Sequence, residues 1–410
     1  MNPFHFRQAP VALRPFSLLA ALLVIALPGL ASAQTARPDS LPRPVEFNSR
    51  GLVFKGSDGF RYSALRFRIQ QWAAFATEDG QDGIAHSQLF IRRSRVRFQA
   101  RVWDPRFTAD VQLSFARGDL DFENSGIPNI LRDAVVRWQA TPRLELMGGQ
   151  TKLPGNRQRV MSSGEQQFPD RSIVNGTFTL DRDMGLWAEY ATGTEGFPVV
   201  LKGALTSGEG RAVNTGNAGI AYTGRVELLP LGAFLNGGDQ FEGDLSREPE
   251  PRVAIGLTLS HNEQGERTGG QLGQYLFAPR DMDVAHADVL LKYRGFSFST
   301  ELMRRRAKDP ITTDGLETRA VRVGSGVTAQ AAYLFANNVE LGARWSKVDP
   351  HRDIWAEMEA QRQVSGVLTR YIQGHRVKMH LEVLRDDFRD NLTGVTRGGW
   401  TARTSFEFGI

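Results

Sequence analysis

The sequence predicts an all-β protein, a transmembrane antiparallel β-barrel of about 16 strands with one inward-folded loop. Apolar and polar residues alternate in segments that often reach ten or more residues. The connections between these segments are alternately short and long. Strands that cross a bilayer at a tilt need about 9–11 residues, whereas soluble strands usually have about 5–6. Unpaired backbone groups are not tolerated in lipid, so such strands must close into a barrel. A soluble β-sandwich is the alternative that strand length disfavours.

Composition excludes several other classes. The 410 residues are 41% hydrophobic and 23% charged and include 42 glycines, values that do not fit a collagen, a coiled coil or a disordered chain. Cysteine is absent, which excludes disulfides, iron–sulfur clusters and thiolate zinc sites. Lysine occurs at only seven positions, so 43 of the 50 basic residues are arginine, whose planar fork binds oxyanions.

Residues 1–33 read as a secretory signal peptide. Arg7 and Arg14 precede a short apolar run over 16–27, and Ala31-Ser32-Ala33 supplies the cleavage site. A membrane-anchoring helix is the weaker alternative, because the run is short of the roughly 20 residues a span needs. Residues 34–60 follow as an extended, proline-bearing tether with a possible short hairpin, and the barrel is expected over 61–410.

The strand assignment rests on a period of two. Val96, Phe98 and Ala100, for example, alternate with Arg95 and Arg97, which gives one apolar and one polar face. The sixteen expected strands cover residues 61–76, 87–103, 106–117, 130–140, 143–152, 183–192, 197–207, 217–229, 251–262, 283–294, 295–306, 319–335, 338–347, 362–372, 375–386 and 399–410. Alternation is weakest in 362–372, and a count that differs by two is the alternative.

Short turns on one rim and longer loops on the other are typical of outer-membrane barrels. The connection over 230–251 is the exception, because it is long where a short turn is due. In the last strand the even-numbered residues from Trp400 to Ile410 are largely apolar or aromatic, and this ending looks like the assembly signal of bacterial outer-membrane proteins.

With the apolar faces toward lipid, the opposite faces carry more basic than acidic residues. The seventeen basic residues expected in the lumen are Arg66, Arg68, Arg93, Arg95, Arg97, Arg101, Arg137, Lys202, Arg225, Arg252, Lys292, Arg294, Arg322, Arg344, Arg376, Lys378 and Arg403. Ten acidic residues join them, which leaves the lumen cationic. Arg93, Arg95, Arg97 and Arg101 form a ladder along which an anion can pass, because residues two apart on one face lie about 6.5–7 Å apart. Alternatively, the ladder is structural and pairs with acids such as Asp110 on the next strand.

The connection over 153–182 is long enough to fold inward and narrow the pore, as it does in sixteen-stranded porins. Its basic residues are Arg157, Arg159, Arg171 and Arg182. An exposed surface loop is the alternative.

The layout resembles the phosphate-selective porin O and P family over most of the chain after residue 33. The stretches that carry the resemblance are GLVFKGSDGFRYSALRFRIQ (51–70), FIRRSRVRFQARVW (90–103), LELMGGQTKLPG (144–155), RDMGLWAEY (182–190) and YTGRVELLPLG (222–232). The resemblance implies a trimeric outer-membrane channel for anions, with phosphate or polyphosphate preferred and gripped by an arginine ladder plus lysines. Lysine is scarce here, and Lys152, Lys202, Lys292, Lys347 and Lys378 are the inward candidates.

These observations predict a porin of the bacterial outer membrane that lets anions diffuse passively and performs no chemistry. Outer-membrane lipid, small anions such as phosphate and further copies in a homotrimer are the expected partners. No cofactor, metal or nucleic acid is expected, since the basic residues are dispersed at strand period rather than gathered in one patch. A barrel with a non-transport role, either a lipid-active enzyme or a structural barrel with a plugged lumen, is the alternative.

Overall fold

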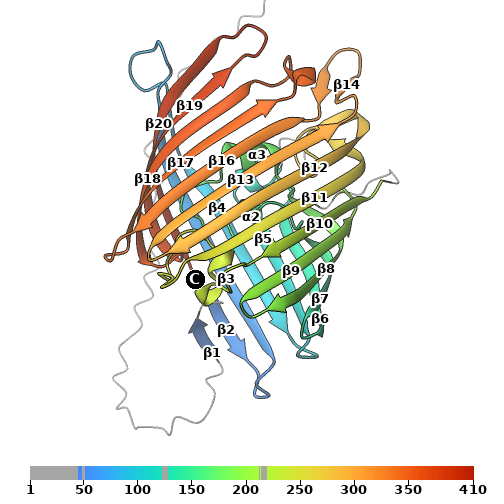
Figure 1. The fold of residues 1–410 in the computed structure, drawn as a ribbon, viewed down its shortest axis with the longest axis vertical. Coiled ribbons are helices and arrows are strands. Elements are labelled where there is room, and N and C mark those ends of the chain that lie inside the picture. The colour runs from blue at the N-terminus through green and yellow to red at the C-terminus, as the bar shows by residue number, and fades with distance from the viewer. Residues whose placement is uncertain (1–44, 49–50, 122–127, 212, 214–218) are drawn as a thin grey trace, which may run out of the picture. The chain divides into compact units, whose positions relative to one another are not determined.

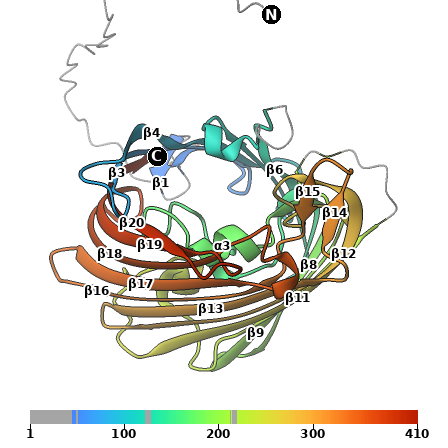
Figure 2. The same ribbon diagram turned by 90° about the horizontal axis from the view of Figure 1, so that it is seen from above.

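The computed structural model describes residues 45–48, 51–121, 128–211, 213 and 219–410, and the expected signal peptide lies outside them. Sixteen antiparallel strands form a closed barrel, as predicted, and β20 pairs with β3 to complete it (Figures 1 and 2). The barrel strands are β3 (Tyr62–Ala76), β4 (His86–Arg101), β5 (Phe107–Ser114), β6 (Leu131–Thr141), β7 (Leu144–Lys152), β8 (Arg182–Thr194), β9 (Phe197–Thr206), β10 (Ala221–Leu228), β11 (Arg252–Arg267), β12 (Tyr275–Tyr293), β13 (Phe296–Ala307), β16 (Gly324–Leu334), β17 (Val339–Pro350), β18 (Ala360–Gln373), β19 (Val377–Arg389) and β20 (Thr396–Gly409).

Two short strands precede the barrel. β1 (Val45–Asn48) pairs with β2 (Gly51–Lys55), and β2 pairs with the beginning of β3, from Leu52 opposite Leu65 to Lys55 opposite Tyr62. β20 takes the remainder of the same edge of β3, from Gly409 opposite Arg68 onward. β2 and β20 together pair with the backbone groups along this edge of β3. The first barrel strand can therefore extend beyond the short-turn rim without an unpaired edge (Figure 1).

The observed strands follow the predicted segments closely, with two differences at the long-loop rim. β11 and β12 continue beyond the predicted ends, and irregular pairing between Asn262 and Arg267 hides their alternation. The link between β13 and β16 carries its own hairpin, β14 (Ile311–Thr313) with β15 (Thr318–Ala320), where the sequence predicted the start of the next strand.

The outer face of the barrel is apolar and ends in aromatic residues near the short-turn rim. Leu186, Leu259 and Leu341 are among its exposed aliphatic side chains. Trp103, Phe107, Trp138, Phe197, Phe296, Tyr333 and Phe408 are exposed near the short turns. Apolar bands flanked by aromatic girdles are the surface that a bilayer requires of a barrel. No helix among the described residues is long and apolar enough to cross a membrane.

Two connections fold into or under the lumen. The loop over 153–181 contains α2 (Arg157–Val160) and α3 (Ile173–Phe178) and lies inside the barrel, as predicted (Figure 2). Val174 and Phe178 of α3 are fully buried against Met303 of β13 and Val348 of β17. The connection between β10 and β11 contains the 3₁₀ turn η2 (Leu235–Gln240) and joins this loop from the short-turn side. Two further 3₁₀ turns, η1 (Arg117–Asp119) and η3 (Arg352–Ile354), belong to long loops.

Candidate functional site: a cationic cavity in the lumen

The loop over 153–181, called the inner loop below, leaves a cavity of about 600 Å³ beside strands β3 to β9. Eleven basic residues line it: Arg66, Arg68, Arg95, Arg97, Arg132, Arg137, Lys152, Arg171, Arg182, Lys202 and Arg376. Four acidic residues accompany them: Asp110, Asp133, Glu165 and Glu189. The cavity is therefore strongly cationic and is the candidate site for an anion.

Buried hydrogen bonds to wall residues fix the inner loop in the lumen. Asp288 of β12 accepts from Nε of Arg157 at 2.7 Å and from both terminal nitrogens of Arg225, at 2.7 and 3.0 Å. Glu301 of β13 accepts from the side-chain amide of Asn156 at 2.9 Å, and Lys378 of β19 donates to the carbonyl oxygen of Gly164 at 2.9 Å. Wall residues on three strands thus hold the loop from its beginning to its middle.

The connection between β10 and β11 supports the inner loop from below. The backbone N–H of Glu242 donates to the carbonyl oxygen of Glu165 at 2.8 Å, and the Glu242 carboxylate accepts from the N–H of Gln167 at 2.8 Å. Lys292 of β12 caps the carbonyl oxygens of Gly238 and Phe241 at 2.6 and 2.8 Å. The unexpected length of this connection is therefore explained by its packing against the inner loop.

The predicted arginine ladder is present, and each of its first three members pairs with an acid. Arg93 pairs with Asp170 of the inner loop at 2.5 Å, and Arg95 with Asp119 of η1 at 2.7 Å through Nε. Arg97 pairs with Asp110 of the adjoining strand at 2.9 Å, as the structural alternative anticipates. Arg101 instead lies over the ring of Tyr62, near the short-turn rim. Carboxylates thus offset much of the ladder's charge.

Two arginines in the cavity form no ion pair with a described acid. The guanidinium groups of Arg66 in β3 and Arg376 in the β18–β19 turn have no hydrogen bond or ion pair with any described residue. Arg376 lies 5.8 Å above the ring of Phe47. Arg66 lies within electrostatic reach of Arg97, Glu165 and Arg376. Because both lie toward the short-turn rim, the free donors concentrate at one end of the cavity.

Lys152 and Arg171 also lack a carboxylate partner in the described part of the chain. Lys152 donates to the carbonyl oxygens of Val160 and Met161, at 2.6 and 3.1 Å. Arg171 donates to those of Gln158 and Met161, at 2.7 and 3.0 Å. Backbone carbonyls satisfy the donors without cancelling the charge, so Lys152 at the end of β7 and Arg171 of the inner loop each add a positive charge to the cavity wall.

Lys347, an expected inward residue, lies instead on the exposed face of β17 and pairs with Asp349. Several other predicted lumen residues hold the structure together. Arg68 and Arg137 line the cavity but lie 3.4 Å from Glu407 and 3.0 Å from Glu145. Arg182 pairs with Asp133 at 2.9 Å, and Arg159 pairs with Asp181. Arg344 is buried over the ring of Phe168 and donates to the carbonyl oxygen of Asp170 at 2.9 Å. With Lys292 and Lys378, these residues fix the inner loop and its surroundings.

Two predicted pore-lining residues are not on the barrel wall. β12 ends at Tyr293, and Arg294 occupies the following turn, exposed and with a positive φ of 47°. β16 begins only at Gly324, so Arg322 lies in the link that follows the β14–β15 hairpin. Both residues fit the period of two in the sequence although they lie outside the strands. Alternation alone therefore does not show where a strand begins or ends.

Arg92 and Arg132 are lumen residues that the alternation did not predict. Gln70 pairs with Arg93 and Gln71 with Ile91, so Arg92 is the extra residue of a β-bulge and reaches Asp170 at 2.8 Å. Arg132 is the extra residue between Leu131 and Asp133, and it is buried 3.1 Å from Asp119. A bulge inserts one residue and shifts the phase, so two consecutive residues face inward.

Asp170 ties the ladder to the inner loop over a wide pH range. Burial alone would raise the pKa of Asp170, but the charges of Arg93 and Arg92 outweigh it and hold the pKa below its ordinary value. Its contribution to loop attachment is therefore complete above the ordinary pKa of about 3.9 and is lost only as the pH falls through the lower folded-state pKa. We expect hydrogen-exchange protection around residue 170 to stay constant between about pH 7 and 4.5; loss of protection near pH 5 would contradict this attachment.

Three solved structures illustrate what the fold is similar to. The outer membrane channel DcaP of Acinetobacter baumannii superposes with a TM-score of 0.55 at 11% identity, over 87% of this chain and 99% of that one. The anion-selective porin from Comamonas acidovorans gives 0.47 at 13% identity, over 84% of this chain and 99% of that one. OmpT of Vibrio cholerae, in its trimer form, gives 0.46 at 11% identity, over 84% of this chain and 99% of that one.

No protein-family model and no curated protein sequence matches the chain. The likeness to DcaP therefore rests on the fold. The closed sixteen-stranded barrel with its apolar outer belt assigns the chain to the outer-membrane β-barrels of bacteria.

Proposed function

We propose that this barrel is a passive anion channel of the outer membrane, related to the phosphate-selective porin O and P family. The observation that carries the proposal is the cavity beside β3 to β9, where eleven basic residues face four acidic ones. A cationic lumen with low-dielectric walls concentrates anions and repels cations. Rings of arginine and lysine are a common way for pores to select anions and phosphate.

In this proposal an anion passes between the inner loop and the β3–β9 wall and exchanges part of its water for guanidinium hydrogen bonds. Arg171 of the inner loop and Lys152 at the end of β7 present charge to the cavity, and Arg66 and Arg376 offer unoccupied donors toward the short-turn rim. Paired arginines such as Arg97 and Arg95 keep the wall rigid and bind anions less tightly, which favours exit.

Phosphate or polyphosphate is the proposed cargo, because a planar guanidinium binds phosphate oxygens in pairs. Chloride and other small anions would pass by the same route with weaker binding. The proposed oligomer is a homotrimer, in line with the family resemblance, and the proposed channel carries out no reaction.

The decisive experiment is the reversal potential of the purified protein in a planar bilayer under a KCl gradient, followed by titration with phosphate. We expect anion selectivity and a chloride current that phosphate blocks with saturation. Anion selectivity without block would leave a general anion channel. Cation selectivity, or no conductance from protein with the gel mobility of a folded barrel, would overturn the channel and favour the structural or enzymatic barrel.

A further inference from the structure

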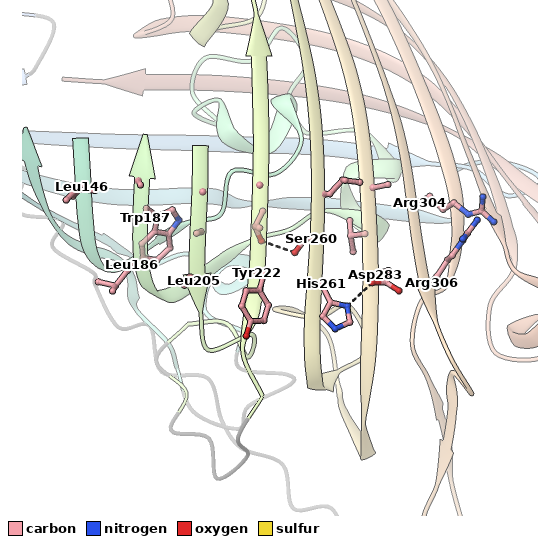
Figure 3. A pocket seen from close by; sticks show the side chains of 18 residues that line it. Leu146, Leu186, Trp187, Leu205, Tyr222, Ser260, His261, Asp283, Arg304 and Arg306 are labelled. Atoms are coloured by element: carbon pink, nitrogen blue, oxygen red, sulfur yellow. Dashed lines mark hydrogen bonds and ion pairs between the residues drawn. The ribbon is translucent and has the colours of Figure 1, made fainter. Parts of the chain in front are cut away.

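The outer wall of the barrel carries a groove that the proposed channel does not use. It has a volume of about 1000 Å³ and extends over strands β7 to β13, where Leu146, Leu186, Leu205 and Tyr222 line it (Figure 3). This volume lies at the upper end of the range of about 300–1,000 Å³ for ligand pockets. Most of its lining is apolar, yet Arg304 and Arg306 stand at one side of it.

The floor of the groove is formed where three small residues lie side by side on β8, β9 and β10. Ala188 pairs with Gly203 and Gly203 with Gly224, and the row then continues through the larger Leu259 to Ala285. The neighbouring rows are bulkier: Leu186, Leu205 and Tyr222 on the side of the long loops, and Tyr190, Leu201 and Val226 on the other. A Cβ atom added at Gly203 or Gly224 would meet nothing within 4 Å, so the hollow is open space rather than a packed contact.

Positive charge borders the groove near the long-loop rim. Arg304 and Arg306 face outward near the end of β13, and neither makes an ion pair or hydrogen bond with a described residue. Their Cα atoms are about 6.5–7 Å apart, which lets both guanidinium groups reach one phosphate. The nearest carboxylate in the lining, Asp283, accepts a hydrogen bond from Nδ1 of His261 at 2.8 Å. Two arginines beside an apolar hollow match a lipid with a phosphorylated headgroup.

We propose that this groove binds one phosphorylated glycolipid of the outer leaflet, of the lipid A class. Its acyl chains would lie over Gly203 and Gly224, and one phosphate would bind Arg304 and Arg306. The long loops of such barrels face the outside of the cell, so this half of the wall meets the outer leaflet. The lipid would cover an apolar hollow that a single bilayer chain fills poorly, and it would fix β8 and β9, which also border the cavity.

The test is native mass spectrometry of the detergent-solubilised barrel titrated with diphosphorylated lipid A, with phosphatidylglycerol and phosphatidylcholine in parallel. We expect one tightly bound lipid A, and binding weaker by roughly 10- to 50-fold after Arg304→Gln with Arg306→Gln. Gly203→Leu with Gly224→Leu fills the hollow and is expected to abolish tight binding. Gly366→Leu is the matched control, because Gly366 is exposed on β18 and its added Cβ also meets open space.

Four outcomes would overturn the proposal. Equal affinity in all variants would show that the groove is not the site. Equal binding of phosphatidylcholine would remove the role of the arginines, and equal binding of phosphatidylglycerol would exclude selection of the glycolipid. If the leucine variant changed only the oligomeric mass, the groove would be a contact between copies of the chain. Heat-modifiable gel mobility confirms that each variant is folded, and the channel measurements above are independent of every outcome.

Discussion

Replacing Arg66 and Arg376 together by glutamate is expected to turn an anion-preferring pore into a cation-preferring one. Both side chains line the cavity and neither forms an ion pair with a described residue, so their charge is available to passing ions. The change removes two positive charges and adds two negative ones at the short-turn end of the cavity. The ratio of chloride to potassium permeability should fall about tenfold or more, which corresponds to about 1.4 kcal/mol.

Reversal potentials at low salt measure this effect best, because the Debye length is about 30 Å at 0.01 M and about 3 Å at 1 M. Arg294→Glu is the matched control, since Arg294 is exposed in a turn away from the cavity and should leave selectivity unchanged. If both variants shifted the reversal potential equally, surface charge would dominate. If neither did, the cavity would not lie on the ion path.

The fold was predictable from the sequence because lipid and lumen impose opposite requirements on alternate residues. β3, β7, β9 and β13 begin and end within a residue of their predicted bounds, since tight turns and a change of polarity coincide there. Where pairing is irregular, as in β11 beyond Asn262, the alternation no longer reports the strand. The period of two indicates which side chains face lipid and which face the lumen only where strand pairing is regular.

The site was predictable in composition and less so in arrangement. Alternation placed Arg66, Arg95 and Arg97 in the lumen, but it could not show that Asp119 and Asp170 come from distant loops to pair with the ladder. Those pairings depend on how the long loops fold, which strand periodicity does not encode. The bulges at Arg92 and Arg132 were hidden for the related reason that one inserted residue leaves no local sequence signal.

The second large effect is expected from Asp288→Ala, which removes the carboxylate that holds the start of the inner loop. Asp288 is buried and accepts hydrogen bonds from both Arg157 and Arg225. Without it Arg225 retains Glu227 at 2.8 Å, whereas Arg157 retains only the carbonyl oxygen of Asp239 at 3.3 Å. Breaking a buried ion pair from one side costs about 3–5 kcal/mol, because the remaining charge is stranded.

The inner loop can avoid the cost of a buried, unpaired Arg157 by moving away from the wall. If Arg157 leaves the wall, it regains water, and the inner loop loses its first attachment while Glu301 and Lys378 still hold later points. Single-channel conductance should then rise and become noisy, with a lower urea midpoint for unfolding. Asp349→Ala is the control, because its pair with Lys347 is exposed at the long-loop rim and worth about 0–1 kcal/mol. A destabilised barrel with unchanged conductance would mean that Asp288 stabilises the wall without positioning the loop. Asp288→Asn keeps one acceptor oxygen, so its conductance and urea midpoint should lie between those of Asp288→Ala and the unmodified protein.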